Sequence, residues 1–244
     1  MHTSNQFKPW PLTWSVEHVR RFWNWYGTNP SQAHNYFSLQ VGDAVLQEAA
    51  RRGALRGTVV DLGCGPGHMV ERLLARGLDT LAVDLSPESV EALNRRHAGQ
   101  PHFLGGRVCT PERVSVEDGT ADSVLVIETV EHLEDAPLRG ILGEAGRIAR
   151  RGGYVIVTTP NEENLDDLRT LCPECGCVFH VVQHVRSWSA AALAEAMGRA
   201  GFEPVFCRPV LFSPYPPWLR PLHRLAFAFK GVKLPYLLYI GRKP

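Results

Sequence analysis

The sequence has no run of apolar residues long enough to cross a membrane. A spanning helix needs roughly 18 to 20 consecutive apolar residues, and no segment of this 244-residue chain approaches that length. The first residues, MHTSNQFKPWPLTW, also lack the apolar stretch of a secretory signal peptide. We therefore expect a cytoplasmic protein.

An excess of charge of either sign is absent as well. The chain has 26 Lys and Arg against 25 Asp and Glu, a formal net charge of +1. Such a chain has no overall field that would attract nucleic acid or an anionic membrane. There is no internal repeat or low-complexity segment. With 44% hydrophobic and 21% charged residues, the composition is that of an ordinary globular domain.

Cysteine is scarce and unevenly placed. The six cysteines are at 64, 109, 172, 175, 177 and 207, so three of them fall within six positions. This distribution favours metal binding or reduced thiols over a framework of disulfides.

The pattern of apolar residues divides the chain into two parts. Residues 15–26 and 36–52 have helical periodicity, with Ser15 as the expected N-cap, and we expect 1–53 to form an N-terminal helical lid. From residue 54 onward, apolar strands alternate with helices. The strands are expected near 58–62, 80–84, 101–108, 123–127 and 153–159, and the helices near 67–76, 87–97, 136–150 and 189–200.

Such alternation predicts an α/β fold with a mostly parallel sheet and helices on both faces. A last pair of strands near 203–208 and 235–241 is expected to close the sheet as a hairpin, with a long insert at 213–235 between them.

The stretch VVDLGCGPGH, residues 59–68, follows the first of these strands. Glycine at 63, 65 and 67 allows positive φ and a close approach of the backbone to a ligand. A dinucleotide site would have a third glycine where His68 stands, and the charge of Asp61 would repel a diphosphate but hold a cationic amine.

The second strand ends in LAVDLS, which places Asp84 where a carboxylate can accept both hydroxyl groups of a ribose. The glycine loop leaves room for a ligand, Asp61 can hold an amine and Asp84 can hold a ribose. Together they suit a nucleoside that carries an amino acid. The ligand that these residues predict is S-adenosylmethionine.

Four motifs follow one another along the chain: VVDLGCGPG, LAVDLSPESV, ADSVLVIETVEHLED and RGGYVIVTTPN. With these motifs the chain resembles the class I S-adenosylmethionine-dependent methyltransferases, over roughly residues 55–208. The resemblance implies a Rossmann-like fold with a seven-stranded sheet. It also implies that Asp61, Gly63, Gly65 and Gly67 surround the methionine part of the cofactor, with Asp84 on the ribose and Leu85 on the adenine. One position departs from the pattern: Arg107 stands about where many members have an acid that contacts the adenine.

A group of possible metal ligands follows the fourth strand. In IETVEHLED, one helical turn would put Glu128, Glu131 and His132 on one face, where two carboxylates and an imidazole can bind Mg, Mn, Fe or Zn. His132 and Glu131 are the candidate catalytic residues. Without a metal, Glu128 is expected to contact the cofactor, and His132 is either a general base or a polar residue whose hydrogen bonds are satisfied.

A second resemblance rests on three motifs in this order: E-x-x-E-H, TPN, and His184 before Trp188. In these motifs the chain resembles the metal-dependent RNA 3′-terminal 2′-O-methyltransferases. That resemblance implies Glu128, Glu131, His132 and His184 as metal ligands. It is partial, because Arg186 and Ser187 stand where those enzymes have an aromatic residue and an acid.

The loop expected at 160–187 contains LCPECGCVFH. Cys172 and Cys175 form a C-P-x-C-G turn that suits zinc, and a structural site needs two more ligands, for which Cys177, His180 and His184 are the nearby candidates. The predicted zinc set is Cys172, Cys175, His180 and His184, so two sites compete for His184. The alternative is an ordered loop of reduced thiols over the pocket.

The two ends of the chain are expected to shape the acceptor pocket. The aromatic residues of the N-terminal part either cover the pocket or pack on the sheet. Residues 204–244 contain seven Lys or Arg and no Asp or Glu, so 217–235 is predicted either to touch lipid or to cap the core with a solvated basic face.

Together these patterns predict an S-adenosylmethionine-dependent O-methyltransferase with a small-molecule acceptor and a possible divalent metal. Methylation of RNA termini is the second hypothesis. A non-catalytic module that binds S-adenosylmethionine or zinc is the third.

Overall fold

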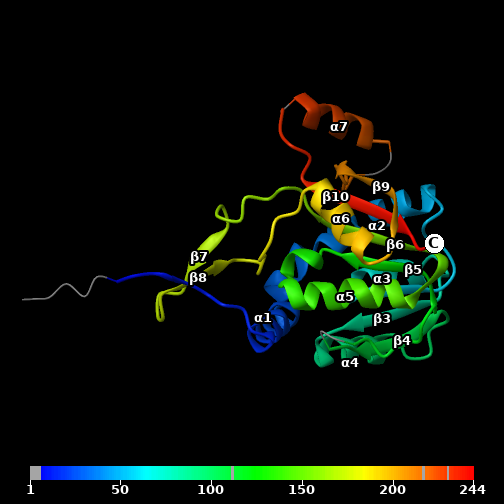
Figure 1. The fold of residues 1–244 in the computed structure, drawn as a ribbon, viewed down its shortest axis with the longest axis horizontal. Coiled ribbons are helices and arrows are strands. Elements are labelled where there is room, and N and C mark those ends of the chain that lie inside the picture. The colour runs from blue at the N-terminus through cyan, green and yellow to red at the C-terminus, as the bar shows by residue number, and fades with distance from the viewer. Residues whose placement is uncertain (1–6, 111–112, 216–217, 230) are drawn as a thin grey trace, which may run out of the picture.

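A computed structural model describes residues 7–110, 113–215, 218–229 and 231–244. Within these residues, seven strands form one sheet in the order β4-β3-β2-β5-β6-β10-β9 (Figure 1). They are β2 (Val59–Leu62), β3 (Thr80–Asp84), β4 (Phe103–Val108), β5 (Ala121–Ile127), β6 (Ala149–Pro160), β9 (Glu203–Val210) and β10 (Tyr236–Arg242).

The strands from β4 to β6 pair in parallel, whereas β10 runs antiparallel to both β6 and β9. The predicted mostly parallel, seven-stranded α/β sheet and its closing hairpin are therefore confirmed.

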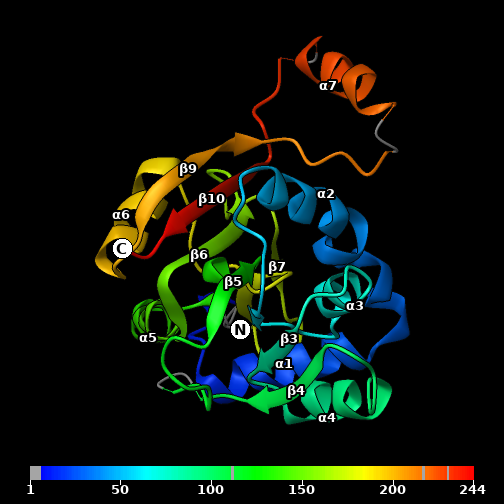
Figure 2. The same cartoon turned by 90° about the vertical axis from the view of Figure 1, so that its right-hand side faces the viewer.

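Helices cover both faces of the sheet (Figure 2). They are α1 (Val16–Thr28), α2 (Phe37–Arg51), α3 (His68–Leu74), α4 (Pro87–Arg96), α5 (Asp135–Ile148), α6 (Ala190–Arg199) and α7 (Arg220–Phe229), with short 3-10 turns at Pro30–Asn35 and Val130–His132. Ser15, Ser86 and Ser189 cap α1, α4 and α6, because each hydroxyl accepts the backbone N–H three residues later.

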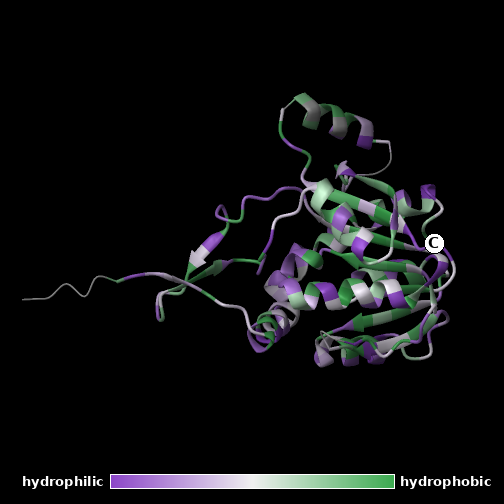
Figure 3. Cartoon of the chain, viewed as in Figure 1, coloured by the Kyte–Doolittle hydropathy of each residue, from purple (hydrophilic) through white to green (hydrophobic). Residues whose placement is uncertain are grey.

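Alternation along the strands divides the core into two layers. In β5, Val124 and Val126 pack with α5 and α6, whereas Leu125 and Ile127 pack with α2 and α3. A strand buried on both faces reads as a continuous apolar run, which is why β5 and β6 are recognisable from the sequence. Figure 3 shows the same apolar character along the strands.

A second, small sheet was not predicted. β1 (Trp10–Pro11), β8 (Cys177–His180) and β7 (Arg169–Leu171) pair in the order β1-β8-β7 and project from the main body (Figure 1). These strands have two to four residues, too few for a period of two to be visible in the sequence. The segment expected as a loop at 160–187 therefore contains a β-hairpin.

The insert at 213–235 contains α7, which stands away from the sheet in both views (Figures 1 and 2). Its side chains Leu222, Leu225 and Phe229 are 62%, 55% and 83% exposed. These three side chains face away from the core, whereas Arg220 of the same helix bonds Gln47 of α2. Among the described residues, no helix is long and apolar enough to span a bilayer.

Candidate active site

A cavity of about 710 Å³ opens at the carboxyl ends of β2, β3 and β5. The order of the strands reverses between β2 and β5, and open α/β sheets bind their ligands at such a point. The cavity is lined by residues 63–66, 84–86 and 109–110, by most of 127–134, and by side chains of α1. This volume is in the range of pockets that hold small-molecule ligands and cofactors.

The glycine-rich loop forms one wall. Gly63 has a φ of +81°, and a Cβ there would lie 2.7 Å from the hydroxyl oxygen of Thr129. Gly65 has a φ of +50° and also lines the cavity. Gly67 does not line it: a Cβ there would lie 2.2 Å from Leu93, so this glycine allows α3 and α4 to pack closely.

Asp84 is held in place by the backbone. Its Oδ2 accepts the N–H of Gly65 and its Oδ1 the N–H of Ser86, both at 2.8 Å. Burial raises the pKa of Asp84, although these N–H groups act in the opposite direction. Each carboxylate oxygen keeps a second lone pair, so Asp84 can still accept hydroxyl groups from a ligand.

Asp61, at the carboxyl end of β2, is 1% exposed, and among the described residues its Oδ2 has no hydrogen-bond partner. Burial, with a smaller contribution from the charge of Asp84, raises the pKa of Asp61 to about 7. A buried carboxylate without a partner is unfavourable, and a cationic amine would relieve this. Asp84 lines the cavity and fits the ribose of S-adenosylmethionine, whereas Asp61 is buried and does not itself line the cavity, so its contact with the amine stays a prediction.

The expected adenine end of the cavity is formed by Leu85, Cys109 and Thr110. Arg107 lies on an exposed part of the edge strand β4 and does not line the cavity. The residue that departs from the family pattern is thus outside the cavity, and Cys109 and Thr110 take the place next to Leu85.

Aromatic side chains from the N-terminal part cover the other side. Trp14, Trp23, Tyr26 and Tyr36 line the cavity, as the lid alternative predicts, whereas Trp10 and Trp25 do not. The Trp23 ring lies 4.7 Å from the His132 ring, measured between centroids.

Gln183 links the aromatic side chains of the N-terminal part to the segment that follows β5. The Trp23 Nε1–H donates to the side-chain oxygen of Gln183 at 2.8 Å. The side-chain amide of Gln183 in turn donates to the backbone carbonyl of His132, also at 2.8 Å. No sequence pattern predicts this connection, because Gln183 and Trp23 are 160 residues apart.

The wall that follows β5 carries the predicted acids and histidines. Glu128, Glu131, His132 and His184 all line the cavity. One ligand atom each from Glu131, His132 and His184 lie within 4.8 Å of one another, and Glu128 is not part of that group. The turn differs from the prediction: Glu128 has a φ of +45°, and a 3-10 turn begins only at Val130.

Burial governs the ionisation of this wall. It lowers the pKa of His132 to about 3, so this imidazole is neutral near pH 7. Burial raises the pKa of Glu128 to about 8 and that of Glu131 well above its ordinary value. Thr159 donates its hydroxyl to Oε2 of Glu131 at 2.9 Å, while Oε1 lies 3.9 Å from Nε2 of His132.

Glu163 and His180 extend the group; Glu163 was not assigned from the sequence, and His180 was assigned to the zinc set instead. Oε2 of Glu163 lies 2.5 Å from Nδ1 of His184, and its Oε1 lies 3.6 Å from Nε2 of His180. The rings of His180 and His184 stack at 4.6 Å. The sequence does contain one signal for Glu163. The acid pair in NEEN follows β6 directly, and the carboxyl ends of β6 and β5 lie at the same edge of the sheet.

The residues of this wall fit a divalent cation. Among the described residues, Oε1 of Glu128, Oε1 of Glu131 and Nε2 of His180 are buried and have no hydrogen-bond partner. Buried polar atoms are normally partnered. Each of the two groups, Glu131 with His132 and His184 and Glu163 with His180 and His184, offers one carboxylate and two imidazoles, ligand types that divalent metals of the first transition row accept.

The predicted zinc set of Cys172, Cys175, His180 and His184 is wrong. His180 and His184 gather around Glu163, whereas Cys172 and Cys175 gather with Cys177. The sequence could not decide this, because β8 separates Cys177 from His180 and a strand carries its two ends apart.

Comparison with known proteins points to one family. The family model described as a methyltransferase domain matches residues 32–205. An uncharacterized methyltransferase of Mycobacterium tuberculosis is 35% identical over 130 residues, which are 53% of this chain and 48% of that protein. A ubiquinone biosynthesis O-methyltransferase of Methylocella silvestris is 35% identical over 104 residues, 42% of this chain and 40% of that protein. The chain thus spans about half the length of the curated relatives it matches.

Among solved structures, the 1,6-didemethyltoxoflavin-N1-methyltransferase of Burkholderia thailandensis, with bound 1,6-didemethyltoxoflavin and S-adenosylhomocysteine, has the same fold. Its TM-score is 0.63 at 18% sequence identity, and the match covers 100% of this chain and 98% of that one.

Proposed function

The chain belongs to the methyltransferase domain family, and we propose that it transfers the methyl group of S-adenosylmethionine to an oxygen of a small, largely apolar acceptor, with a divalent cation holding that oxygen. One observation carries the proposal. The acids and histidines Glu131, His132 and His184 line the same cavity as the glycine loop and Asp84. Donor and acceptor groups can therefore meet inside one enclosed site.

The chain's own residues would divide the work as follows. Asp61 and Asp84 hold the amine and the ribose, so that the sulfonium methyl group points into the cavity. The acceptor oxygen then forms its bond to the methyl carbon as the carbon–sulfur bond breaks, leaving S-adenosylhomocysteine. Glu128, which lines the same wall with one oxygen unpartnered, is placed to take the proton that the hydroxyl loses.

The cation would be held by Glu131, His132 and His184. When bound, it would lower the pKa of the acceptor hydroxyl and fix the position of its oxygen. Glu163 holds Nδ1 of His184 and so leaves Nε2 as the ligand atom, an arrangement common around metal-bound histidines. Thr159 holds one oxygen of Glu131 and leaves the other free for the cation.

The lining of the cavity favours a small apolar acceptor over an RNA terminus. Trp14, Trp23, Tyr26 and Tyr36 offer aromatic faces to the acceptor. Of the described residues that line the cavity, Arg20 is the only Lys or Arg, and it is paired with Glu17 at 2.7 Å. Recognition of an RNA backbone needs several free cations. The relative that acts in ubiquinone biosynthesis as an O-methyltransferase supports the same choice.

Methyl transfer from radiolabelled S-adenosylmethionine to a cell extract tests the proposal. We expect label in small molecules that partition into organic solvent and keep the label in mild alkali, as ethers do. Asp84→Ala should give no such label. Label in RNA that disappears after periodate oxidation of terminal diols would favour the second hypothesis, and no transfer with added Mg²⁺, Mn²⁺ or Zn²⁺ would contradict the proposal.

Affinity for S-adenosylmethionine should depend on pH through Asp61. Because the pKa of this carboxyl is about 7 without ligand, binding of a cationic amine requires it to lose a proton. Affinity should fall roughly 10- to 30-fold between pH 7.5 and pH 5.5. Calorimetry with S-adenosylmethionine measures this, and Asp61→Asn should bind more weakly at pH 7.5 with little dependence on pH. The same slope in Asp61→Asn would assign the proton to another group.

We also propose that α7 touches an anionic lipid surface. Leu222, Leu225 and Phe229 are exposed on this helix, Trp218 beside it is 74% exposed, and the last 41 residues carry only positive side-chain charge at neutral pH. Apolar side chains together with basic charge are typical of helices that lie in a membrane interface.

Sedimentation with vesicles tests this contact. Wild-type protein should sediment with phosphatidylglycerol vesicles at low salt and much less with phosphatidylcholine vesicles. Leu222→Ser with Phe229→Ser should reduce binding at least about tenfold, since each apolar side chain contributes about 1.5 to 3 kcal/mol when buried. Equal binding of the double variant would contradict the contact.

A further inference from the structure

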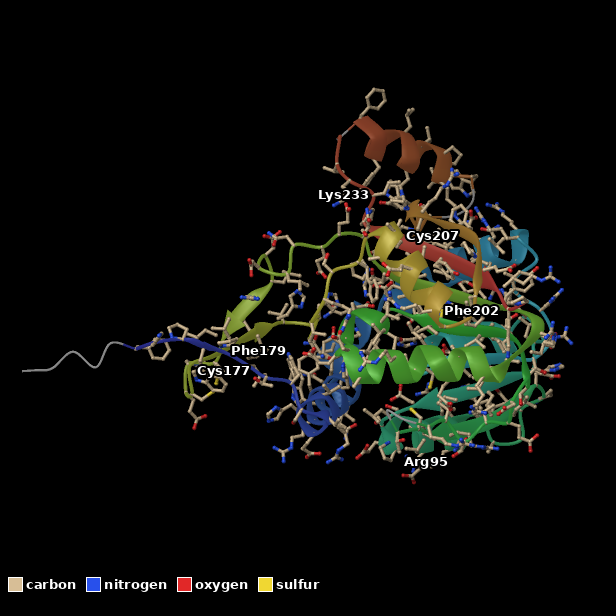
Figure 4. The ribbon with its side chains drawn as sticks, in the orientation of Figure 1. Arg95, Cys177, Phe179, Phe202, Cys207 and Lys233 are labelled. Atoms are coloured by element: carbon tan, nitrogen blue, oxygen red, sulfur yellow. The ribbon has the colours of Figure 1, made fainter. Side chains whose placement is uncertain are left out.

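Three thiols meet at the tip of the projecting hairpin, away from the cavity. The sulfur atoms of Cys172, Cys175 and Cys177 lie within 4.8 Å of one another, and all three cysteines are free. Figure 4 shows Cys177 on this projecting part and Cys207 in the main body. The proposed methyltransferase reaction uses none of these sulfur atoms.

The backbone of the turn is arranged around the thiols. Gly176 has a φ of +78°, its N–H donates to the carbonyl of Cys172 at 2.9 Å, and the N–H of Cys172 donates to the carbonyl of Cys177 at 2.8 Å. These bonds fold the six residues 172–177 so that all three sulfur atoms face one point. The indole N–H of Trp10 also donates to the carbonyl of Cys175 at 2.9 Å.

The hairpin has little else to stabilise it. β1, β7 and β8 contain two to four residues each, and Leu168, Leu171 and Val181 are exposed around them. A sheet of this size with exposed apolar side chains is marginal on its own. Small folds of this kind are usually held by a disulfide or a metal, and three thiols cannot all be paired in disulfides.

We propose that Cys172, Cys175 and Cys177 bind one Zn²⁺ ion that holds the β7–β8 hairpin. Three thiolates select a soft, tetrahedral ion. They leave a fourth position, and because Cys175 is exposed, this position faces solvent and takes a water molecule or an external ligand. His180 and His184 are not available to it, because they gather around Glu163.

The zinc also has a consequence for the active site. β8 begins at Cys177 and ends at His180, and His184 follows four residues later. An ion that fixes Cys177 therefore fixes the start of the segment that carries these two histidines. Loss of zinc should loosen this segment and increase its backbone hydrogen exchange, while the seven-stranded sheet keeps its protection.

Metal analysis of the full chain, purified without a tag or chelator, tests the proposal. We expect one zinc per chain in wild type and in Glu163→Gln, which alters the partner of His184 and leaves the three thiols unchanged. Cys175→Ser, an exposed position whose replacement leaves the core intact, should retain less than about a tenth of the zinc. Cys207→Ser, a half-buried thiol outside the group, is the matched control and should retain all of it.

Replacement of zinc by Co²⁺ gives a second readout. Wild type and Glu163→Gln should show intense thiolate-to-cobalt absorption in the near ultraviolet, and Cys175→Ser should not. Zinc that stays in Cys175→Ser, or wild type that takes up no zinc from an equimolar solution, would overturn the assignment. S-adenosylmethionine binding, measured on the same samples, shows independently whether the proposed methyltransferase site is intact.

Discussion

Glu131→Gln should lower kcat by more than about 100-fold and leave the affinity for S-adenosylhomocysteine within about threefold of wild type. Loss of a group that only orients a metal ligand already costs about 10- to 100-fold, and Glu131 is proposed as a ligand itself. Glutamine has the same shape and its oxygen can still accept the hydroxyl of Thr159, so the fold should persist. The change removes the charge that the cation requires.

Steady-state rates with and without added Mn²⁺ measure the effect. Glu162→Gln is the matched control, because Glu162 is half exposed and pairs with Lys233 outside the cavity. It should behave as wild type. Full activity in Glu131→Gln would contradict a role for this carboxylate in catalysis, and unchanged activity after chelation would leave the general-base alternative for His132.

Asp84→Ala should weaken S-adenosylhomocysteine binding by roughly 100-fold. The carboxylate is proposed to accept the ribose hydroxyls, and a hydrogen bond to a charged group contributes about 1.5 to 3 kcal/mol. The substitution also removes the acceptor for the N–H of Gly65, so the glycine loop loses an anchor at the same time. Both effects act on the cofactor and neither acts on the cation.

Calorimetry for the cofactor and metal analysis for the cation separate the two. Asp79→Asn is the control. Asp79 comes directly before β3, at the end of that strand opposite to Asp84, and it is half exposed and pairs with His102. It should bind the cofactor normally. If Asp84→Ala bound S-adenosylhomocysteine within about threefold of wild type, the ribose would be held elsewhere.

The sheet was predictable because burial on both faces leaves a signal in every strand. β5 and β6 contain the apolar runs 124–127 and 154–157, and serine caps mark the starts of α1, α4 and α6. The short strands β1, β7 and β8 were missed because pairing in a sheet of this size depends on distant residues, such as Trp10 against Cys177.

The same limit applies to the site. Asp61 is the next-to-last residue of β2 and Asp84 the last residue of β3, so their place near the edge of the sheet was expected from the sequence. Which ligands share a site was not, because Glu163 and His184 meet only after β7 and β8 have folded back. This is why the sequence assigned His184 to two sites and overlooked Glu163.

The central claim is that the cofactor and a cation share one cavity. Its most direct test is the relaxation of the methyl protons of bound S-adenosylmethionine when Mn²⁺ is added. We predict strong broadening of the methyl signal in wild type and in Cys175→Ser, and none at the same Mn²⁺ concentration in Glu131→Gln. A sharp methyl signal in wild type saturated with Mn²⁺ would contradict the claim, because it would place the cation far from the transferred group.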